Sequence, residues 1–91
     1  MKFTVIWTPA AETDLAGVWI KHADERAAII RAASSIDALL EESPQSRGES
    51  RYDTVRVLLV SPLGVDFDVQ EQDRIGYVLT AWHTGKVRRA T

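Results

Sequence analysis

The stretch VRVLLVSPLGVDFDVQEQDRIGYVLTAWH, residues 55–83, contains the strongest structural signal in the sequence. It holds three segments rich in β-branched and aromatic residues, and the turn-forming sequences SPLG and EQD separate them. In the middle segment Val65, Phe67 and Val69 alternate with polar residues, which is the pattern of a half-buried strand. The stretch therefore predicts three consecutive strands, at 55–60, 65–70 and 75–83.

The residues before this stretch predict one strand and two helices. Phe3 to Trp7 is rich in β-branched and aromatic residues and predicts the first strand. Thr8-Pro9 predicts a helix start, since threonine can cap the free N–H groups and proline is tolerated at the first helical position. We expect this helix to end near His22, which would act as its C-terminal cap. A second helix, capped by Asp24, is expected from Glu25 to about Glu42, because apolar residues recur there at helical spacing and Ser43-Pro44 follows.

Residues 43–53 predict a polar connection between the helices and the later strands, long enough to indicate a functional role. The order of elements is β-α-α-β-β-β. Because hardly any loop joins the helices, they should form an αα-hairpin. The fold class is α+β, an antiparallel sheet with this hairpin packed on one face and the other face open to a ligand. We expect one domain over residues 1–91, with a tail from about residue 84 that could be flexible.

The composition excludes several classes of site. The chain has no cysteine, so disulfides and thiolate chemistry are excluded. Its net charge is −2, but residues 1–45 carry a net −3 and residues 46–91 a net +1, so an anionic ligand should meet the second half. No apolar segment is long enough to cross a bilayer, and the N-terminal segment lacks the pattern of a secretion signal. We therefore expect a cytoplasmic protein that does not contact a membrane.

Several segments together resemble the RelE/ParE superfamily of bacterial toxins. They are the opening strand followed by TPAAETDL at 8–15, the RGESR sequence at 47–51, VRVL at 55–58 and YVLTAWH at 77–83. The resemblance lies in their order and spacing, and it covers nearly the whole chain.

The resemblance implies a toxin of a type II toxin–antitoxin pair, and two activities are known in the family. RelE-like members cut messenger RNA in the ribosomal A site without a metal or cofactor, whereas ParE-like members poison DNA gyrase and lack the nuclease residues. Both are silenced by a cognate antitoxin, and the pair often represses its own operon, so operator DNA would be bound only through the antitoxin.

Metal-free RNA cleavage needs a general acid or base and a cation that stabilises the phosphate. Arg56 matches the arginine that RelE-like nucleases carry in this strand, although it could equally pair with Asp66 or Asp68. His83 resembles the terminal histidine of some of these nucleases, and imidazole exchanges a proton near neutral pH. A solvated histidine beside a turn is the alternative.

Two basic clusters could bind RNA phosphates. Arg47 and Arg51 belong to the first cluster and Lys86 to the second, where Arg88 and Arg89 follow it. Acidic residues are interleaved with the first cluster, so the alternative is a solvated surface that binds no RNA. Tyr52 could stack on a base or pack where the strand begins. Asp66 and Asp68 share a strand face, but no further ligands stand at suitable spacing, so no metal site is expected. Trp7, Trp19 and Trp82 are expected to be core or antitoxin-facing anchors.

The sequence therefore leaves three hypotheses. The first is a ribosome-dependent mRNA endoribonuclease that uses Arg56 and His83. The second is a ParE-like toxin that binds DNA gyrase, and the third is a non-toxic interaction module of the same fold. The acidic net charge, and the absence of lysine from the connection before Arg56, weigh against the first.

Overall fold

The computed structural model describes residues 2–52 and 54–87, and at residues 51, 52, 86 and 87 it describes the backbone alone. The elements, in chain order, are β1 (Thr4–Trp7), α1 (Pro9–Lys21), the 3-10 turn η1 (Ala23–Glu25), α2 (Arg26–Glu42), the 3-10 turn η2 (Pro44–Ser46), β2 (Glu49–Tyr52), β3 (Val55–Val60), β4 (Leu63–Gln70), β5 (Ile75–His83) and α3 (Thr84–Val87). No helix within these ranges is long and apolar enough to span a membrane.

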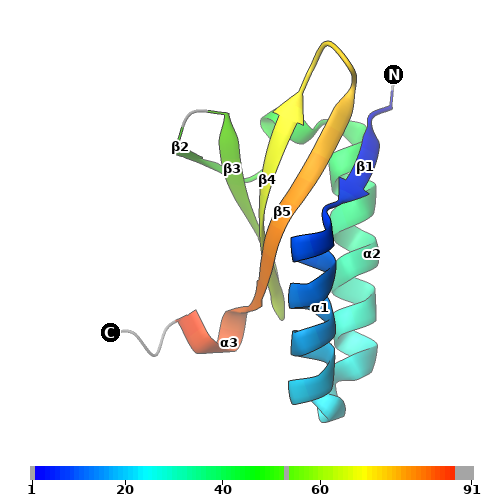
Figure 1. The fold of residues 1–91 in the computed structure, drawn as a ribbon, viewed down its shortest axis with the longest axis vertical. Helices are drawn as coiled ribbons and strands as arrows, with labels where there is room; N and C mark the ends of the chain where they lie inside the picture. The colour runs from blue at the N-terminus through cyan, green and yellow to red at the C-terminus, as the bar shows by residue number, and fades with distance from the viewer. Residues whose placement is uncertain (1, 53, 88–91) are drawn as a thin grey trace.

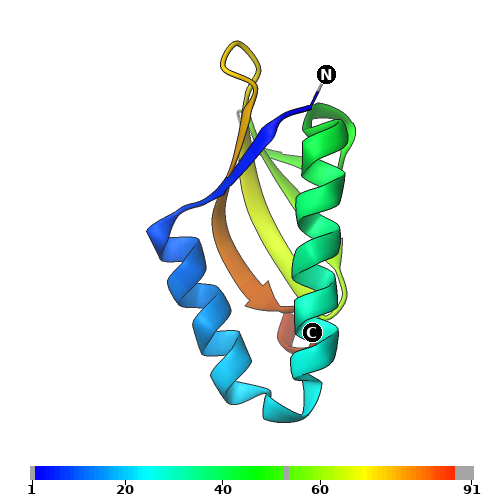
Figure 2. The same ribbon diagram turned by 90° about the vertical axis from the view of Figure 1, so that its right-hand side faces the viewer.

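The five strands form one sheet in the order β1-β5-β4-β3-β2 (Figure 1). The pairs β2–β3, β3–β4 and β4–β5 are antiparallel, whereas β1 pairs with β5 in parallel. Figure 2 shows α1 and α2 side by side on one face of this sheet. The predicted α+β class, with an αα-hairpin on one face of the sheet, is therefore confirmed.

Local sequence signals explain where α1 begins and ends. The Thr8 hydroxyl accepts a hydrogen bond from the Ala11 N–H at 3.2 Å and donates one to the Val78 carbonyl oxygen at 2.9 Å. It thus caps the helix as predicted and also ties the helix start to β5. His22 is the C-cap, and its backbone N–H donates to the Val18 carbonyl oxygen, so this prediction is also confirmed.

The core lies between the helical hairpin and the sheet. Most of its large fully buried side chains come from α2, β4 and β5: Ile29, Ile36, Leu40, Leu63, Val65, Phe67 and Val78. Burying a side chain of this size contributes about 1.5–3 kcal/mol, so this layer supplies most of the stabilisation. The Trp7 indole N–H donates to Asp37 Oδ1 at 2.8 Å, which joins β1 to α2.

The structure corrects one local prediction and adds a strand. Asp24 does not cap α2: it lies in η1, and the N-cap is Glu25, which makes no side-chain capping bond. The connection 43–53 contains the edge strand β2, where Glu49 and Ser50 pair with Val57 and Arg56. Its polar sequence gave no strand signal because short, charged strands are typical of sheet edges.

Candidate functional site

The strand register assigns Arg56 to the face of the sheet that the helices cover. Arg56 pairs with the buried Phe67, and paired residues point to the same face. Leu58, two residues further along β3, packs against the core on that face. Arg56 itself is only partly buried and lines a shallow hollow of about 210 Å³, together with Gln45, Thr54, Val69 and Glu71.

The guanidinium group of Arg56 is bound to the backbone of the connection that precedes β2. Its Nε donates to the Arg47 carbonyl oxygen at 2.7 Å, and its Nη2 donates to the Gly48 carbonyl oxygen at 2.9 Å. Gly48 has a φ of +65°, and a Cβ there would overlap the Val57 carbonyl oxygen, so only glycine fits without strain. In this arrangement Arg56 holds the entry to β2 in place.

His83 lies at the opposite end of the helix-covered face, under the turn between α1 and α2. Its Nε2 is 3.0 Å from Glu25 Oε1, and its Nδ1 accepts a hydrogen bond from the Gly85 N–H at 3.1 Å. Its ring stacks on that of His22, with centroids 3.8 Å apart and planes 7° from parallel. Both ring nitrogens of His83 are therefore engaged, and only 11% of its side chain is exposed.

Arg56 and His83 do not share a site in this structure. Arg56 is level with Phe67 of β4, whereas His83 is level with Leu63, and a whole strand separates β3 from β5. With about 3.3 Å per residue along a strand and about 4.8 Å between strands, their Cα atoms are roughly 16 Å apart. His83 is instead surrounded by Glu25 and His22. The sequence did not predict this contact, because Glu25 and His83 are 58 positions apart.

The predicted RNA-binding residues are only partly described. Arg47 is half-buried, and its Nε is buried without a hydrogen-bond partner among the described atoms. The backbone of Arg51 lies in β2 and that of Lys86 in α3, but the side chains of both, and of Tyr52, lie outside the described part of the chain. Arg88 and Arg89 are also outside the described residues.

The sheet face that the helices leave uncovered is apolar and acidic. The register assigns to it Val57, Leu59, Asp66, Asp68, Thr80 and Trp82. The Trp82 indole and the Leu59 side chain lie directly over Gly64, where a Cβ would come within 3 Å of both. Asp66 accepts a hydrogen bond from the Thr80 hydroxyl at 2.9 Å.

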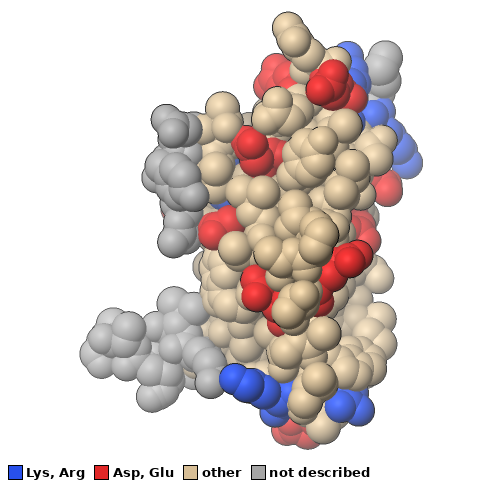
Figure 3. Space-filling view, viewed as in Figure 1, with Lys and Arg blue, Asp and Glu red and all other residues tan. Residues whose placement is uncertain are grey.

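No lysine or arginine of the described strands β3, β4 and β5 points to this uncovered face. Figure 3 has the view of Figure 1, with β1 and α1 at the front, so it shows an edge of the sheet and not this face; on that edge, acidic side chains lie over the middle and basic ones gather towards the two ends. Because the register puts Asp66 and Asp68 on the uncovered face, RNA phosphates would meet carboxylates rather than cations on the described part of β3, β4 and β5 there.

Neither a family model nor a curated protein matches the sequence. Solved structures do match the fold. One is the RelBE2 toxin–antitoxin complex from Mycobacterium tuberculosis, with a TM-score of 0.71 and 16% identity over 91% of this chain and 99% of that one. Another is the chromosomal ParDE toxin–antitoxin system from P. aeruginosa, with a TM-score of 0.69 and 19% identity over 89% of this chain and 95% of that one. The architecture of this chain is accordingly that of a RelE/ParE-like toxin fold.

Proposed function

We propose that this protein is the toxin of a type II toxin–antitoxin pair, and that it acts by binding a protein target rather than by cutting RNA. The toxin assignment is supported by the fold, which matches toxin–antitoxin complexes of both the RelE and the ParE type over about nine-tenths of the chain. The proposed target is DNA gyrase, in line with the ParE-like alternative.

The observation that carries the choice of mechanism is the engagement of both nuclease candidates. Arg56 donates from Nε and Nη2 to two backbone carbonyl oxygens, and both ring nitrogens of His83 have partners. A general acid or base must reach the reacting proton within hydrogen-bond distance. His83 would have to leave Glu25 or Gly85 to do so, and Arg56 would still be roughly 16 Å away by the strand spacings.

The uncovered face supports a protein target. Leu59 is 62% exposed, and it lies beside Trp82 over Gly64. Exposed aliphatic side chains next to a tryptophan are typical of protein–protein contacts, whereas a surface for RNA is expected to be basic. Cleavage of mRNA by Arg56 and His83 stays a prediction that competes with this proposal.

We propose a cognate antitoxin as the second partner. The exposed apolar side chains Ile6, Ile20, Ile30 and Leu59 offer area that a partner would cover. Binding to the folded state raises thermal stability by linkage, so co-expression with the product of the adjacent gene should raise the Tm of the toxin and its soluble yield. No increase in either quantity would argue against an antitoxin.

The mechanism is tested by inducing the protein in bacteria and following growth, transcript integrity and chromosomal breaks. We expect growth arrest with intact transcripts, and inhibition of purified gyrase. Leu59→Glu should relieve the arrest, whereas Ile20→Glu should not, because Ile20 is 69% exposed on α1 and not on the uncovered sheet face. Variants must be compared at equal soluble levels.

The same experiment separates the two mechanisms. Transcripts cut only when ribosomes are present, with cleavage lost in His83→Gln, would overturn the binding mechanism and establish the nuclease. Absence of arrest in the wild type would contradict both and leave the non-toxic interaction module.

A further inference from the structure

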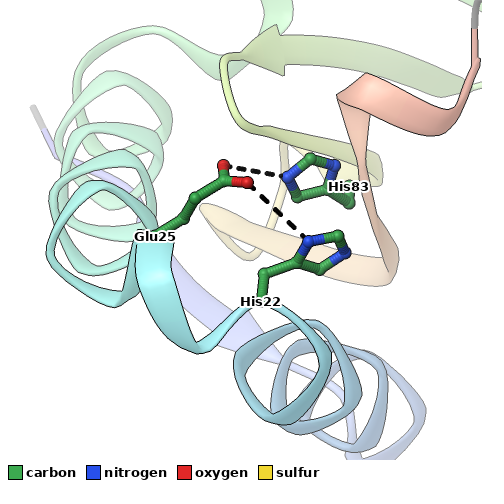
Figure 4. A group of neighbouring side chains, drawn as sticks. All are labelled: His22, Glu25 and His83. Atoms are coloured by element: carbon green, nitrogen blue, oxygen red, sulfur yellow. Dashed lines mark hydrogen bonds and ion pairs between the residues drawn. The ribbon is translucent and has the colours of Figure 1, made fainter.

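We propose that His22, Glu25 and His83 form a binding site for a divalent transition-metal ion of the zinc class. Figure 4 shows the three side chains converging from the end of α1, the η1 turn and the end of β5. One ligand atom from each residue lies within 4.8 Å of the others. This inference does not depend on the proposed toxin function.

The donor atoms define the class of metal. Two imidazole nitrogens and one carboxylate oxygen suit Zn²⁺, Co²⁺, Ni²⁺ and Cu²⁺, whereas Mg²⁺ and Ca²⁺ prefer oxygen ligands. Three protein ligands leave a fourth position for water or a further ligand. A hollow of about 300 Å³ adjoins the site and is lined by both imidazoles, together with Gly17, Lys21 and Trp82, so a water molecule has room there.

The distances from the two imidazoles to the Glu25 carboxylate, each to a different oxygen, lie on either side of the spacing in a tetrahedral site. His83 Nε2 is 3.0 Å from Glu25 Oε1, and His22 Nδ1 is 3.8 Å from Glu25 Oε2. With bonds of about 2.0–2.2 Å to zinc, ligand atoms in a tetrahedral site are roughly 3.3–3.5 Å apart. The exposed fractions of the side chains are 20% for His22, 37% for Glu25 and 11% for His83, which leaves an open route for the ion while reducing competition from water.

Metal binding requires two small changes at the imidazoles. The rings are stacked, and parallel rings cannot direct both in-plane lone pairs at one ion, so they must tilt about their broad χ2 torsions. Because His83 Nδ1 accepts from the Gly85 N–H, the proton of the neutral ring is on Nε2. That proton moves to Nδ1 when Nε2 binds the ion, and the hydrogen bond from Gly85 is given up.

The site would add a link between two parts of the fold that already touch through the Glu25–His83 contact and the stacked imidazoles. His22 and Glu25 belong to the turn of the helical hairpin, and His83 ends β5, which lies between β1 and β4 in the sheet. An ion held by all three would therefore fix the hairpin turn to the end of the sheet and raise the thermal stability of the folded state.

The test uses the untagged full-length protein, because a histidine tag would itself bind the ion. The chain has two histidines and no cysteine, so both imidazoles that could serve a metal are in this cluster. Zn²⁺ is titrated by calorimetry and by competition with a chromophoric chelator, Co²⁺ by visible absorption, and the Tm is measured with and without Zn²⁺. The variants are His22→Gln, Glu25→Gln and His83→Gln, with Asp24→Asn as the matched control because Asp24 is exposed in the same turn.

We expect binding of one Zn²⁺ per chain, an increase in Tm, and a Co²⁺ absorption band typical of tetrahedral nitrogen and oxygen ligands. Each of the three variants should weaken binding at least roughly tenfold, and Asp24→Asn should not. Absence of saturable one-to-one binding would overturn the proposal. Unchanged affinity for Zn²⁺ in a His83→Gln variant that circular dichroism shows to be folded would also overturn it, since the ion would then be bound elsewhere.

Discussion

The Nε of Arg56 donates a hydrogen bond to the backbone carbonyl oxygen of Arg47 over 2.7 Å. Its Nη2 donates a second bond to the adjacent carbonyl oxygen, that of Gly48, over 2.9 Å. One side chain therefore holds two consecutive peptide groups where the polar connection enters the edge strand β2. The arginine that the family resemblance marked as catalytic has a structural role that can be measured without any activity assay.

We expect Arg56→Ala to lower the free energy of unfolding by about 1.5–3 kcal/mol, the usual contribution of hydrogen bonds from a charged group. Arg56→Lys should recover only part of this, because an ammonium cannot reproduce the two-pronged geometry. Urea denaturation followed by circular dichroism measures both changes. Arg31→Ala, on the exposed surface of α2, is the control and should stay within about 0.5 kcal/mol of the wild type. Equal effects of Arg56→Ala and Arg31→Ala would show that the two bonds do not contribute.

The two glycines Gly48 and Gly17 should respond in opposite directions to replacement by alanine. Gly48 has a φ of +65° and would push its Cβ against the Val57 carbonyl oxygen, so Gly48→Ala should cost at least about 2 kcal/mol. At Gly17, inside α1, a Cβ meets nothing within 4 Å, so Gly17→Ala should stabilise the fold by up to about 1 kcal/mol. Thermal unfolding of the two variants gives the signs directly, and a stabilised Gly48→Ala protein would refute the described path of the chain at the entry to β2.

The hydrogen bond between Trp7 and Asp37 is suited to a double-mutant cycle. Trp7→Phe removes the donor and Asp37→Ala the acceptor, and each is partly buried. We expect a coupling energy of about 1–2 kcal/mol. Hydrogen bonds to charged acceptors can contribute up to about 3 kcal/mol, but this pair is not fully removed from water. If the two single changes simply add, the contact does not stabilise the attachment of β1 to α2.

Replacements of Thr8 distinguish capping from packing. Thr8→Val keeps the shape but removes the oxygen that accepts from Ala11 and donates to Val78, so the free energy of unfolding should fall by about 1–2 kcal/mol. Thr8→Ser keeps the hydroxyl and should lose much less. Denaturant titration of the three proteins tests this ranking, and a Thr8→Val protein as stable as the Thr8→Ser protein would contradict the role of the cap.

Much of the fold follows from local patterns. The β-branched and aromatic segments and the alternation at 65–70 identify four strands. The Thr8-Pro9 start and the helical spacing before Ser43-Pro44 identify both long helices, because each reflects burial on one face or the chemistry of a helix end. The predicted cap at Asp24 was wrong because a short 3-10 turn, absent from the periodic pattern, separates the two helices. Strand β2 was missed because its side chains carry no strand signal. It forms through backbone hydrogen bonds to β3, which do not depend on those side chains.

The sequence alone established the α+β class, the helical hairpin and the absence of cysteine chemistry, since these depend on composition and on periodicity along the chain. The partner and direction of β1, the face that each strand residue occupies and the meeting of His22, Glu25 and His83 arise only in the folded molecule. Pairing register joins positions that are distant in sequence, and a one-residue change in register would turn Arg56 and His83 to the opposite face. Local patterns carry no information on such long-range contacts, so the positions of these two residues could be learned only from the tertiary arrangement.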